Sequence, residues 1–128
     1  MGKRQVLEVP GVTHGAAPIP MGVRVGNMIF SSGIAGMDPA TSTVPPEPER
    51  QAELMFQNLR TLLTAGGATP DDVAHMTVYI KDNQYRQALN AEWLKMFPDE
   101  HDRPARHTLL YELTGGMLMQ CEVTAVLG

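Results

Sequence analysis

Residues 117–127 constrain the fold more than any other part of the chain, because apolar and polar side chains alternate there. Every second position carries an apolar side chain: Met117, Met119, Cys121, Val123, Ala125 and Leu127. The positions between them are mixed: Leu118, Gln120, Glu122, Thr124 and Val126. A period of two residues indicates a β-strand, whose successive side chains point to opposite faces of a sheet. The pattern therefore predicts a strand that packs one face on helices and leaves a mixed face open.

Two helices are predicted to cover the apolar face. From about residue 48 to 65 the apolar residues recur at helical spacing, and Gly66-Gly67 end that helix. A second helix is expected from about 84 to 97, where Pro98 ends it. Residues 10–22 are rich in Gly and Pro and are predicted to form an irregular arm. Further strands are expected at three places: 23–32, 76–80 and 105–112.

These elements predict an α+β fold in which residues 1–128 form one domain. Two helices can cover only one face of a sheet of four or five strands. An open, mixed face on a small domain is typical of an interface between subunits, so we expect a homo-oligomer.

Charge and composition exclude several classes of protein. The net charge is −4 and the pI about 5.5, whereas nucleic-acid binding needs clustered Lys and Arg. No apolar stretch approaches the ~20 residues of a membrane span. The single Cys121 cannot form an internal disulfide and lies on the apolar face, so we expect an inert thiol and a cytoplasmic protein. The four His and the single Cys show no metal-site spacing, and we expect no metal.

Two short stretches carry candidate chemistry. Arg106 follows Pro104-Ala105 at the head of a predicted strand, where its guanidinium is placed to bind a carboxylate bidentately. Ser32 and Gly33 end an earlier strand and supply a hydroxyl and a close approach of the backbone. Arg103 lies beside a charged loop and is expected to be solvated. The ligand predicted from these residues is a small carboxylic acid.

A series of short motifs runs in order along the chain: Val25-Gly26-Asn27, Phe30-Ser31-Ser32-Gly33, Asp38-Pro39-Ala40-Thr41, Gln57-Asn58-Leu59, Ala65-Gly66-Gly67-Ala68, Asp72-Val73, Thr77-Val78-Tyr79-Ile80-Lys81-Asp82, Asn90, Pro104-Ala105-Arg106 and Glu122-Val123-Thr124-Ala125-Val126. With these motifs the sequence resembles the Rid (reactive intermediate deaminase) or YjgF family from about residue 18 to 126. The resemblance implies a chorismate-mutase-like fold, with one sheet and two helices on one face, assembled as a homotrimer with ligand clefts between subunits. It also implies hydrolysis of 2-imino or 2-enamino acids to 2-keto acids and ammonia without a cofactor. Arg106 would then bind the substrate carboxylate, and Ser32 would belong to the site.

Two positions depart from the pattern of the deaminating members of that family. Ile19 stands where they carry a tyrosine, and Gln120 stands where they carry a glutamate that positions the attacking water. A carboxamide orients a water but cannot accept its proton at neutral pH, whereas Glu122, on the same strand face, could be the base. His14 and His107 are further candidates for acid–base groups, because histidine titrates near neutrality.

We therefore expect an imine or enamine deaminase in which Arg106 fixes the carboxylate and either Gln120 or Glu122 holds the water. Ser32 and the backbone near His107 are expected to line the polar wall of the pocket, and Ile19 is a further expected substrate-binding residue. Arg86 stands where many relatives have an aromatic residue, a further sign of a divergent branch. A 2-aminomuconate-type deaminase acting on a larger dicarboxylate stays open, because that substrate suits the pocket at Ile19 and Gln120 and the extra arginines. A non-catalytic trimer that binds or senses small carboxylates is the other alternative. RNA cleavage, ascribed to some relatives, is disfavoured by the acidic balance of the chain.

Overall fold

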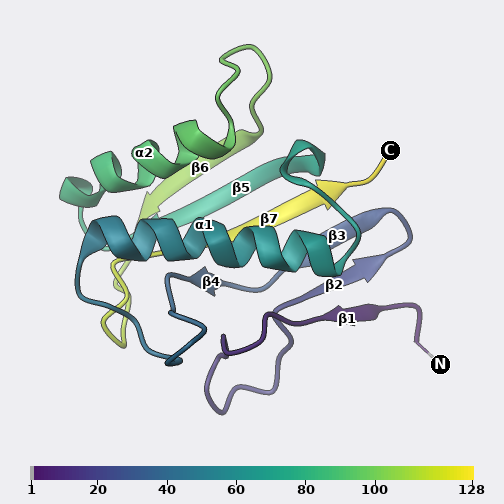
Figure 1. Ribbon diagram of the computed structural model, residues 1–128, viewed down its shortest axis with the longest axis horizontal. Coiled ribbons are helices and arrows are strands. Elements are labelled where there is room, and N and C mark those ends of the chain that lie inside the picture. Colours follow the sequence, from purple (N-terminus) through teal and green to yellow (C-terminus); the bar gives the residue numbers. More distant parts are fainter. Residues whose placement is uncertain (1) are drawn as a thin grey trace.

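The computed structural model describes residues 2–128, which form one mixed β-sheet with two α-helices on one of its faces (Figure 1). The strands among these residues are β1 (Gln5–Leu7), β2 (Gly22–Val25), β3 (Met28–Ser31), β4 (Ile34–Ala35), β5 (Val73–Ile80), β6 (Ala105–Leu110) and β7 (Met119–Val126). The helices are α1 (Pro48–Ala65) and α2 (Arg86–Met96), with short 3-10 helices η1 (Pro70–Asp72) and η2 (Asn83–Tyr85). The expectation of an α+β fold with both helices on one face is confirmed.

β7 lies inside the sheet, between β3 and β5. The strand order is β1-β2-β3-β7-β5-β6, and β4 pairs with β7 next to β3. Alternate residues of β7 are buried beneath the helices, and those between them point to the other face. β5 and β6 run parallel and are joined through α2, whereas the other strand pairs are antiparallel. Because β6 is the last strand in this order, it is an edge strand of the sheet.

α1 begins and ends where the sequence predicts. Pro48 occupies the first turn, where a helix has no use for the amide hydrogen that proline lacks. At the other end the amide of Gly66 donates to the carbonyls of Leu62 and Leu63. The apolar stripe of α1 is fully buried against the sheet, and α2 adds Leu89 and Trp93 to the same core. No helix within residues 2–128 has both the length and the apolar composition needed to cross a membrane.

One polar side chain of α1 is buried because it joins two loops. Gln51 is fully buried, and its Nε2 donates to the carbonyl of Pro45 at 2.7 Å and to that of Gly116 at 3.0 Å. Its Oε1 accepts from the amide of Leu118 at 2.9 Å. A buried amide with all these partners is stabilising, because each contact satisfies a backbone group as well. Gln51 thus fixes the segments before α1 and before β7 to each other.

The structure corrects several sequence-based boundaries. Residues 23–32 form the hairpin β2–β3 rather than one strand, because Gly26 takes a φ of +60° and the chain reverses there. The sheet has seven strands rather than four or five, since the hairpin counts twice and β1 and β4 are added. β5 begins at Val73 rather than at 76, and the second helix starts as the 3-10 turn η2 before α2.

The face of the sheet without helices carries large, exposed side chains. Phe30, Leu109, Tyr111 and Val126 are between 37% and 59% exposed. Tyr79 packs edge-on against Tyr111, with ring centroids 5.6 Å apart. The open face therefore has the mixed apolar and polar character that suits an interface between subunits, and a role as such an interface remains a prediction.

Candidate functional site

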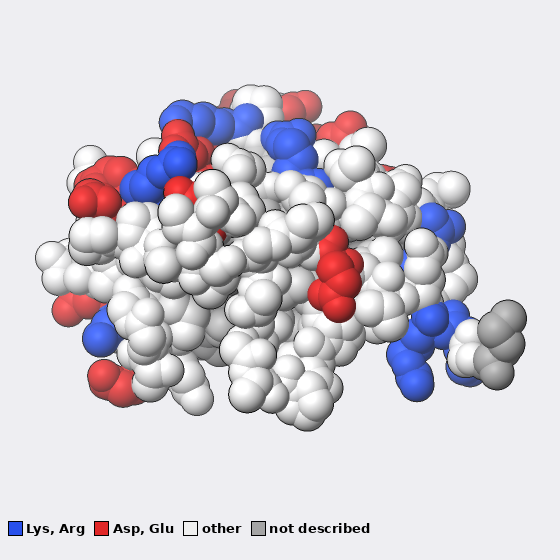
Figure 2. All heavy atoms as spheres, turned by 60° about the horizontal axis from the view of Figure 1, so that its bottom comes forward, with Lys and Arg blue, Asp and Glu red and all other residues white. Residues whose placement is uncertain are grey.

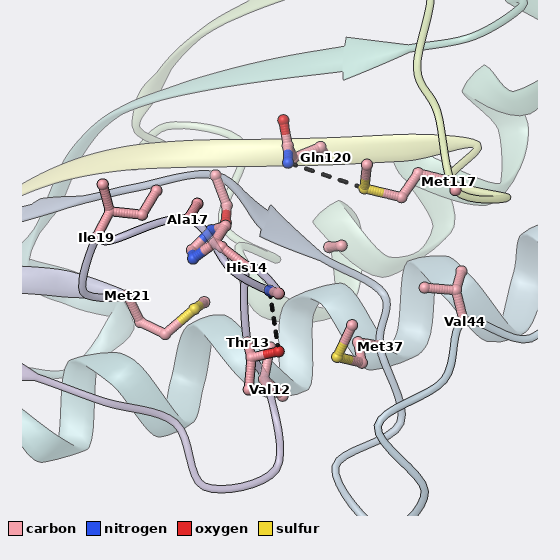
Figure 3. A pocket seen from close by; sticks show the side chains of 14 residues that line it. Val12, Thr13, His14, Ala17, Ile19, Met21, Met37, Val44, Met117 and Gln120 are labelled. Atoms are coloured by element: carbon pink, nitrogen blue, oxygen red, sulfur yellow. Dashed lines mark hydrogen bonds between the residues drawn. The ribbon is translucent and has the colours of Figure 1, made fainter.

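A cavity of about 380 Å³ lies between the N-terminal arm (residues 8–21), β4 and the segment before β7. Its lining is mostly apolar and includes the thioethers of Met21, Met37 and Met117 (Figure 3). Residues 9–23 contain no Lys, Arg, Asp or Glu, and Figure 2 shows few charged side chains over the middle of this side of the molecule. The cavity therefore suits an apolar group on a small ligand.

Gln120 and Ile19, two of the predicted site residues, both line this cavity (Figure 3). The side chain of Gln120 lies directly over Gly33, so close that a Cβ at Gly33 would come within 2.6 Å of the Gln120 carboxamide. The missing side chain of Gly33 thus lets the Gln120 carboxamide approach its backbone closely. Nε2 of Gln120 lies 3.8 Å from Sδ of Met117, whereas its Oε1 has no hydrogen-bond partner among residues 2–128. That oxygen is available to a water or a ligand.

Glu122 lies in a second cavity of about 300 Å³, which shares Gln120 and Gly33 with the first. The hydroxyl of Tyr79 donates to Oε1 of Glu122 at 2.9 Å. This hydrogen bond and the charge of Glu122 raise the pKa of Tyr79, so the phenol stays protonated. Glu122 is therefore already engaged by a neighbour. Tyr79 and Tyr111 are not among the site residues expected from the sequence, because only the register of β5 against β7 places Tyr79 opposite Gln120.

Arg106 lies on the other side of the sheet. It pairs in register with Met76, whose side chain is buried under the helices, and its guanidinium lies over the ring of Trp93, 4.7 Å from the centroid. Its Nη1 is buried and has no hydrogen-bond partner within the described part of the chain. Burial lowers the pKa of Arg106, and the positive charge of Arg86 lowers it further. Arg106 is thus a half-buried cation without a counter-ion in its own chain.

The structure therefore does not bring Arg106 and Gln120 together within one chain. Gln120 points to the open face of the sheet, Arg106 points to the helix face, and neither cavity beside Gln120 is lined by Arg106. His107 is exposed and faces away from Arg106, as the alternation of a strand predicts. A site that uses both Arg106 and Gln120 needs two copies of the chain.

Ser32 does not line either cavity, and its amide donates to the carbonyl of Met21 at 2.8 Å. The neighbouring Ser31 has a structural role, since its hydroxyl accepts from the amide of Val123 at 2.8 Å. Arg103 is exposed, as expected, and its Nε also donates to the carbonyl of Phe97 at 2.8 Å, so that it caps the end of α2.

His14 lines the same cavity as Gln120 and Ile19. Its Nε2 lies 2.6 Å from the carbonyl oxygen of Gly33, the residue against which Gln120 packs. The sequence marked His14 only as a possible acid–base group. Its position beside Gln120 depends on the arm folding back onto the end of β3, which no local pattern shows.

Cys121 is fully buried on the helix face, as expected. Burial, with a smaller effect of the Glu122 charge, raises the pKa of the thiol to about 12. We therefore expect the native protein at pH 8 to react with Ellman's reagent far more slowly than the same protein in urea, because only the exposed thiolate is nucleophilic. Equal rates of thiol release in the two solutions would contradict this burial.

Comparisons with known proteins agree on one family. Residues 15–127 match the family model of endoribonuclease L-PSP. The chain is 32% identical to the reactive intermediate deaminase TdcF of Escherichia coli over 98 residues, which are 77% of this chain and 75% of TdcF. The solved structure of E. coli TdcF with bound serine superposes with a TM-score of 0.87 at 25% identity, covering 97% of this chain and 99% of that one.

Two further proteins are similar to the same extent. The 2-iminobutanoate/2-iminopropanoate deaminase of E. coli is 32% identical over 90 residues, 70% of each chain. A Thermotoga maritima protein described as an endoribonuclease superposes with a TM-score of 0.87 at 30% identity, covering 97% of this chain and 98% of that one.

Proposed function

The chain belongs to the endoribonuclease L-PSP family, also named YjgF or Rid, and from this premise we propose that it is an imine or enamine deaminase. Its substrates are 2-imino or 2-enamino acids, and its products are 2-keto acids and ammonia. One observation carries the proposal: Arg106 has a buried guanidinium nitrogen that no acceptor within residues 2–128 satisfies. A carboxylate supplies two acceptor oxygens in the geometry that guanidinium binds best.

Two relatives support this substrate class. One is named a 2-iminobutanoate/2-iminopropanoate deaminase, and TdcF, named a reactive intermediate deaminase, has bound serine in its solved structure. The first name and the bound serine concern small amino-acid-derived carboxylates. The apolar cavity beside Gln120 would receive the side chain of such a substrate, and its three thioethers can adapt to different shapes.

The proposed enzyme is a homotrimer with its sites between subunits. Arg106 lies on the edge strand β6, whereas Gln120 and Ile19 lie at a cavity on the other side of β7, so one ligand can contact both only if two copies meet. A closed ring of three copies joins unlike surfaces in this way and also covers the open sheet face.

The chemistry needs few groups. Arg106 of one copy fixes the carboxylate, and Oε1 of Gln120 of the other orients a water beside the imine carbon. Attack by that water on the C=N carbon forms a carbinolamine, whose collapse gives the keto acid and releases ammonia. Because imines are intrinsically reactive, positioning alone contributes a large part of the acceleration.

A coupled assay tests the function. An amino-acid oxidase generates imino acids in place, and semicarbazide traps those that are not hydrolysed. We expect the protein to lower semicarbazone formation from amino acids with apolar side chains, in proportion to its concentration. An unchanged semicarbazone yield at all protein concentrations, with 2-keto acids still binding in calorimetry, would favour the non-catalytic, carboxylate-binding alternative.

The assembly is tested separately. We expect sedimentation equilibrium at micromolar concentration to give a mass about three times the 14.0 kDa of the chain. The variant Leu109→Glu, which places a charge on the exposed apolar face, is expected to dissociate the trimer, whereas Leu94→Glu on the surface of α2 is not. A monomeric wild-type protein would contradict the shared site.

A dicarboxylate substrate is the second candidate, favoured by one observation. Arg86 lies close enough to Arg106 to depress its pKa, so two guanidinium groups share one region of α2 and β6. Arg86 bonds the neutral Oδ1 of Asn83 at 3.0 Å and forms no salt bridge with an acid in the described residues. Two cations without an acid favour a ligand with two carboxylates, as in a 2-aminomuconate-type deaminase. Comparing 2-ketobutyrate with 2-ketoglutarate in binding assays distinguishes the two substrate classes.

A further inference from the structure

His14 is held at the cavity by contacts at both ends of the arm. Before it, the hydroxyl of Ser42 donates to the carbonyl of Gly11 at 2.7 Å. After it, the carbonyl of Met21 accepts from the amide of Ser32 at 2.8 Å. The imidazole itself makes the 2.6 Å hydrogen bond to the carbonyl of Gly33. The ring therefore has a fixed place, although the arm belongs to no helix or strand.

That place is beside Gln120. Both side chains contact Gly33, but at different atoms. The carboxamide of Gln120 packs over its Cα, and the imidazole of His14 forms a hydrogen bond with its carbonyl oxygen. His14 is the only titratable side chain among the residues that line the cavity (Figure 3). The cavity thus combines an amide that can orient water with an imidazole that can exchange a proton.

The hydrogen bond also determines which nitrogen is basic. A carbonyl oxygen only accepts, so Nε2 of His14 must carry the hydrogen that points at Gly33. In the neutral ring the lone pair then lies on Nδ1, which has no hydrogen-bond partner within residues 2–128. A neutral imidazole held in one tautomer is a competent general base.

The charged groups near His14 leave this assignment intact. Glu8 lines the adjoining cavity on the arm, and its Oε1 accepts from the amide of Met21 at 3.2 Å. Asp38, from the segment after β4, accepts from the amide of Ala40 through its own Oδ1. On β7, Glu122 lies in the second cavity and is bonded by Tyr79. In the proposed trimer, Arg106 of another copy would be a further charged group at the site.

We propose that His14 is the acid–base residue of this enzyme and does the work that a carboxylate at position 120 would do. This inference rests on the proposed deaminase function. Nδ1 of His14 takes a proton from the water as its oxygen bonds the C=N carbon, and the imine nitrogen gains a proton from the medium. His14 then returns its proton to the nitrogen of the carbinolamine and the C–N bond breaks. The hydroxyl oxygen of the carbinolamine becomes the carbonyl oxygen of the keto acid, its proton passes to the medium, and ammonia leaves.

Two substitutions separate this role from a merely structural one. His14→Gln keeps an N–H donor for the carbonyl of Gly33 but removes the titrating group, whereas His14→Ala removes both. His101→Gln is the matched control, because that histidine is 85% exposed in a loop far along the chain from the arm. All variants are first compared in thermal melting and sedimentation, so that only folded proteins of wild-type assembly are assayed.

We expect His14→Gln to lower kcat by about 100-fold or more at pH 8, with a smaller effect on KM, because general-base catalysis typically contributes 10²–10⁴-fold. A protonated imidazole cannot accept a proton, so the advantage of wild type over His14→Gln should shrink as the solution is made more acidic. Measuring the ratio of the two proteins at each pH cancels the pH dependence of the coupling oxidase. Adding Gln120→Glu to His14→Gln should restore part of the rate.

Three outcomes would overturn the proposal. His14→Gln with wild-type kcat and pH profile would show that the imidazole does not exchange protons. If His14→Ala lost activity while His14→Gln stayed fully active, His14 would have only a structural role, namely the hydrogen bond to the carbonyl of Gly33. A wild-type protein without any turnover would refute the deaminase function and the role of His14 together, which distinguishes that failure from the first two.

Discussion

Replacing Arg106 by alanine is expected to abolish measurable binding of 2-keto acids such as 2-ketobutyrate. The loss of a buried bidentate partner costs about 2–5 kcal/mol, which corresponds to a roughly 30-fold to several thousand-fold weaker affinity. The effect is expected to be large because the guanidinium is half-buried against Trp93 and has a nitrogen that no group in residues 2–128 satisfies. Arg106→Lys should also bind poorly, since an ammonium cannot reproduce the planar fork of the guanidinium.

Isothermal titration calorimetry on each protein measures this effect. Arg103→Ala is the matched control. It removes the same positive charge three residues before Arg106, from a side chain that hydrogen-bonds the end of α2. The control should bind as wild type does. Equal affinities for wild type and Arg106→Ala would instead mean that the guanidinium serves only to cover Trp93.

Gln51→Met is expected to lower the free energy of unfolding by about 2–4 kcal/mol. Methionine fills a similar volume, but it leaves the amide of Leu118 and the carbonyls of Pro45 and Gly116 without their partner. An unsatisfied buried polar group costs about 1–3 kcal/mol, and Gly116 is exposed enough to bond water instead. Urea unfolding at matched protein concentrations measures the difference, because stability of an oligomer depends on concentration.

Gln57→Met is the control for that measurement, since Gln57 is an exposed residue of the same helix. A surface substitution of this kind is expected to change stability by less than about 0.5 kcal/mol. If both variants unfold at the same urea concentration, the two loops are held by contacts other than Gln51.

The elements that depend on local pattern could be predicted from the sequence. The predicted ends of α1 agree with the observed ones, because its apolar spacing, Pro48 and Gly66 all indicate the same boundaries. The alternation in β7 likewise predicted which of its side chains are buried. The hairpin at Gly26 was missed because its two short strands read as one longer apolar run, and β4 was missed because two residues carry no periodicity.

The site was less predictable, because it depends on register and on loops. The sequence indicated that Arg106 and His107 face opposite ways, but only the pairing of Arg106 with Met76 shows that the guanidinium lies on the helix side. The pairing of Tyr79 with Gln120 and the contact of His14 with Gly33 join parts of the chain far apart in sequence. The roles of Arg106, Gln120, Glu122, Ser32, Ile19 and His107 in catalysis remain predictions.

The location of the cavity has a consequence for how such a protein can diverge. Most of its wall comes from the arm and from loop segments, and of the lining residues only Val12 and Met21 belong to the buried core, whereas Arg106 lies on a strand and packs on Trp93. Substitutions that reshape the cavity therefore meet few packing constraints, while the position of the carboxylate-binding arginine is restricted by the sheet. Selection can thus change which ligand side chains the cavity accepts, largely independently of Arg106, which anchors the carboxylate of every ligand.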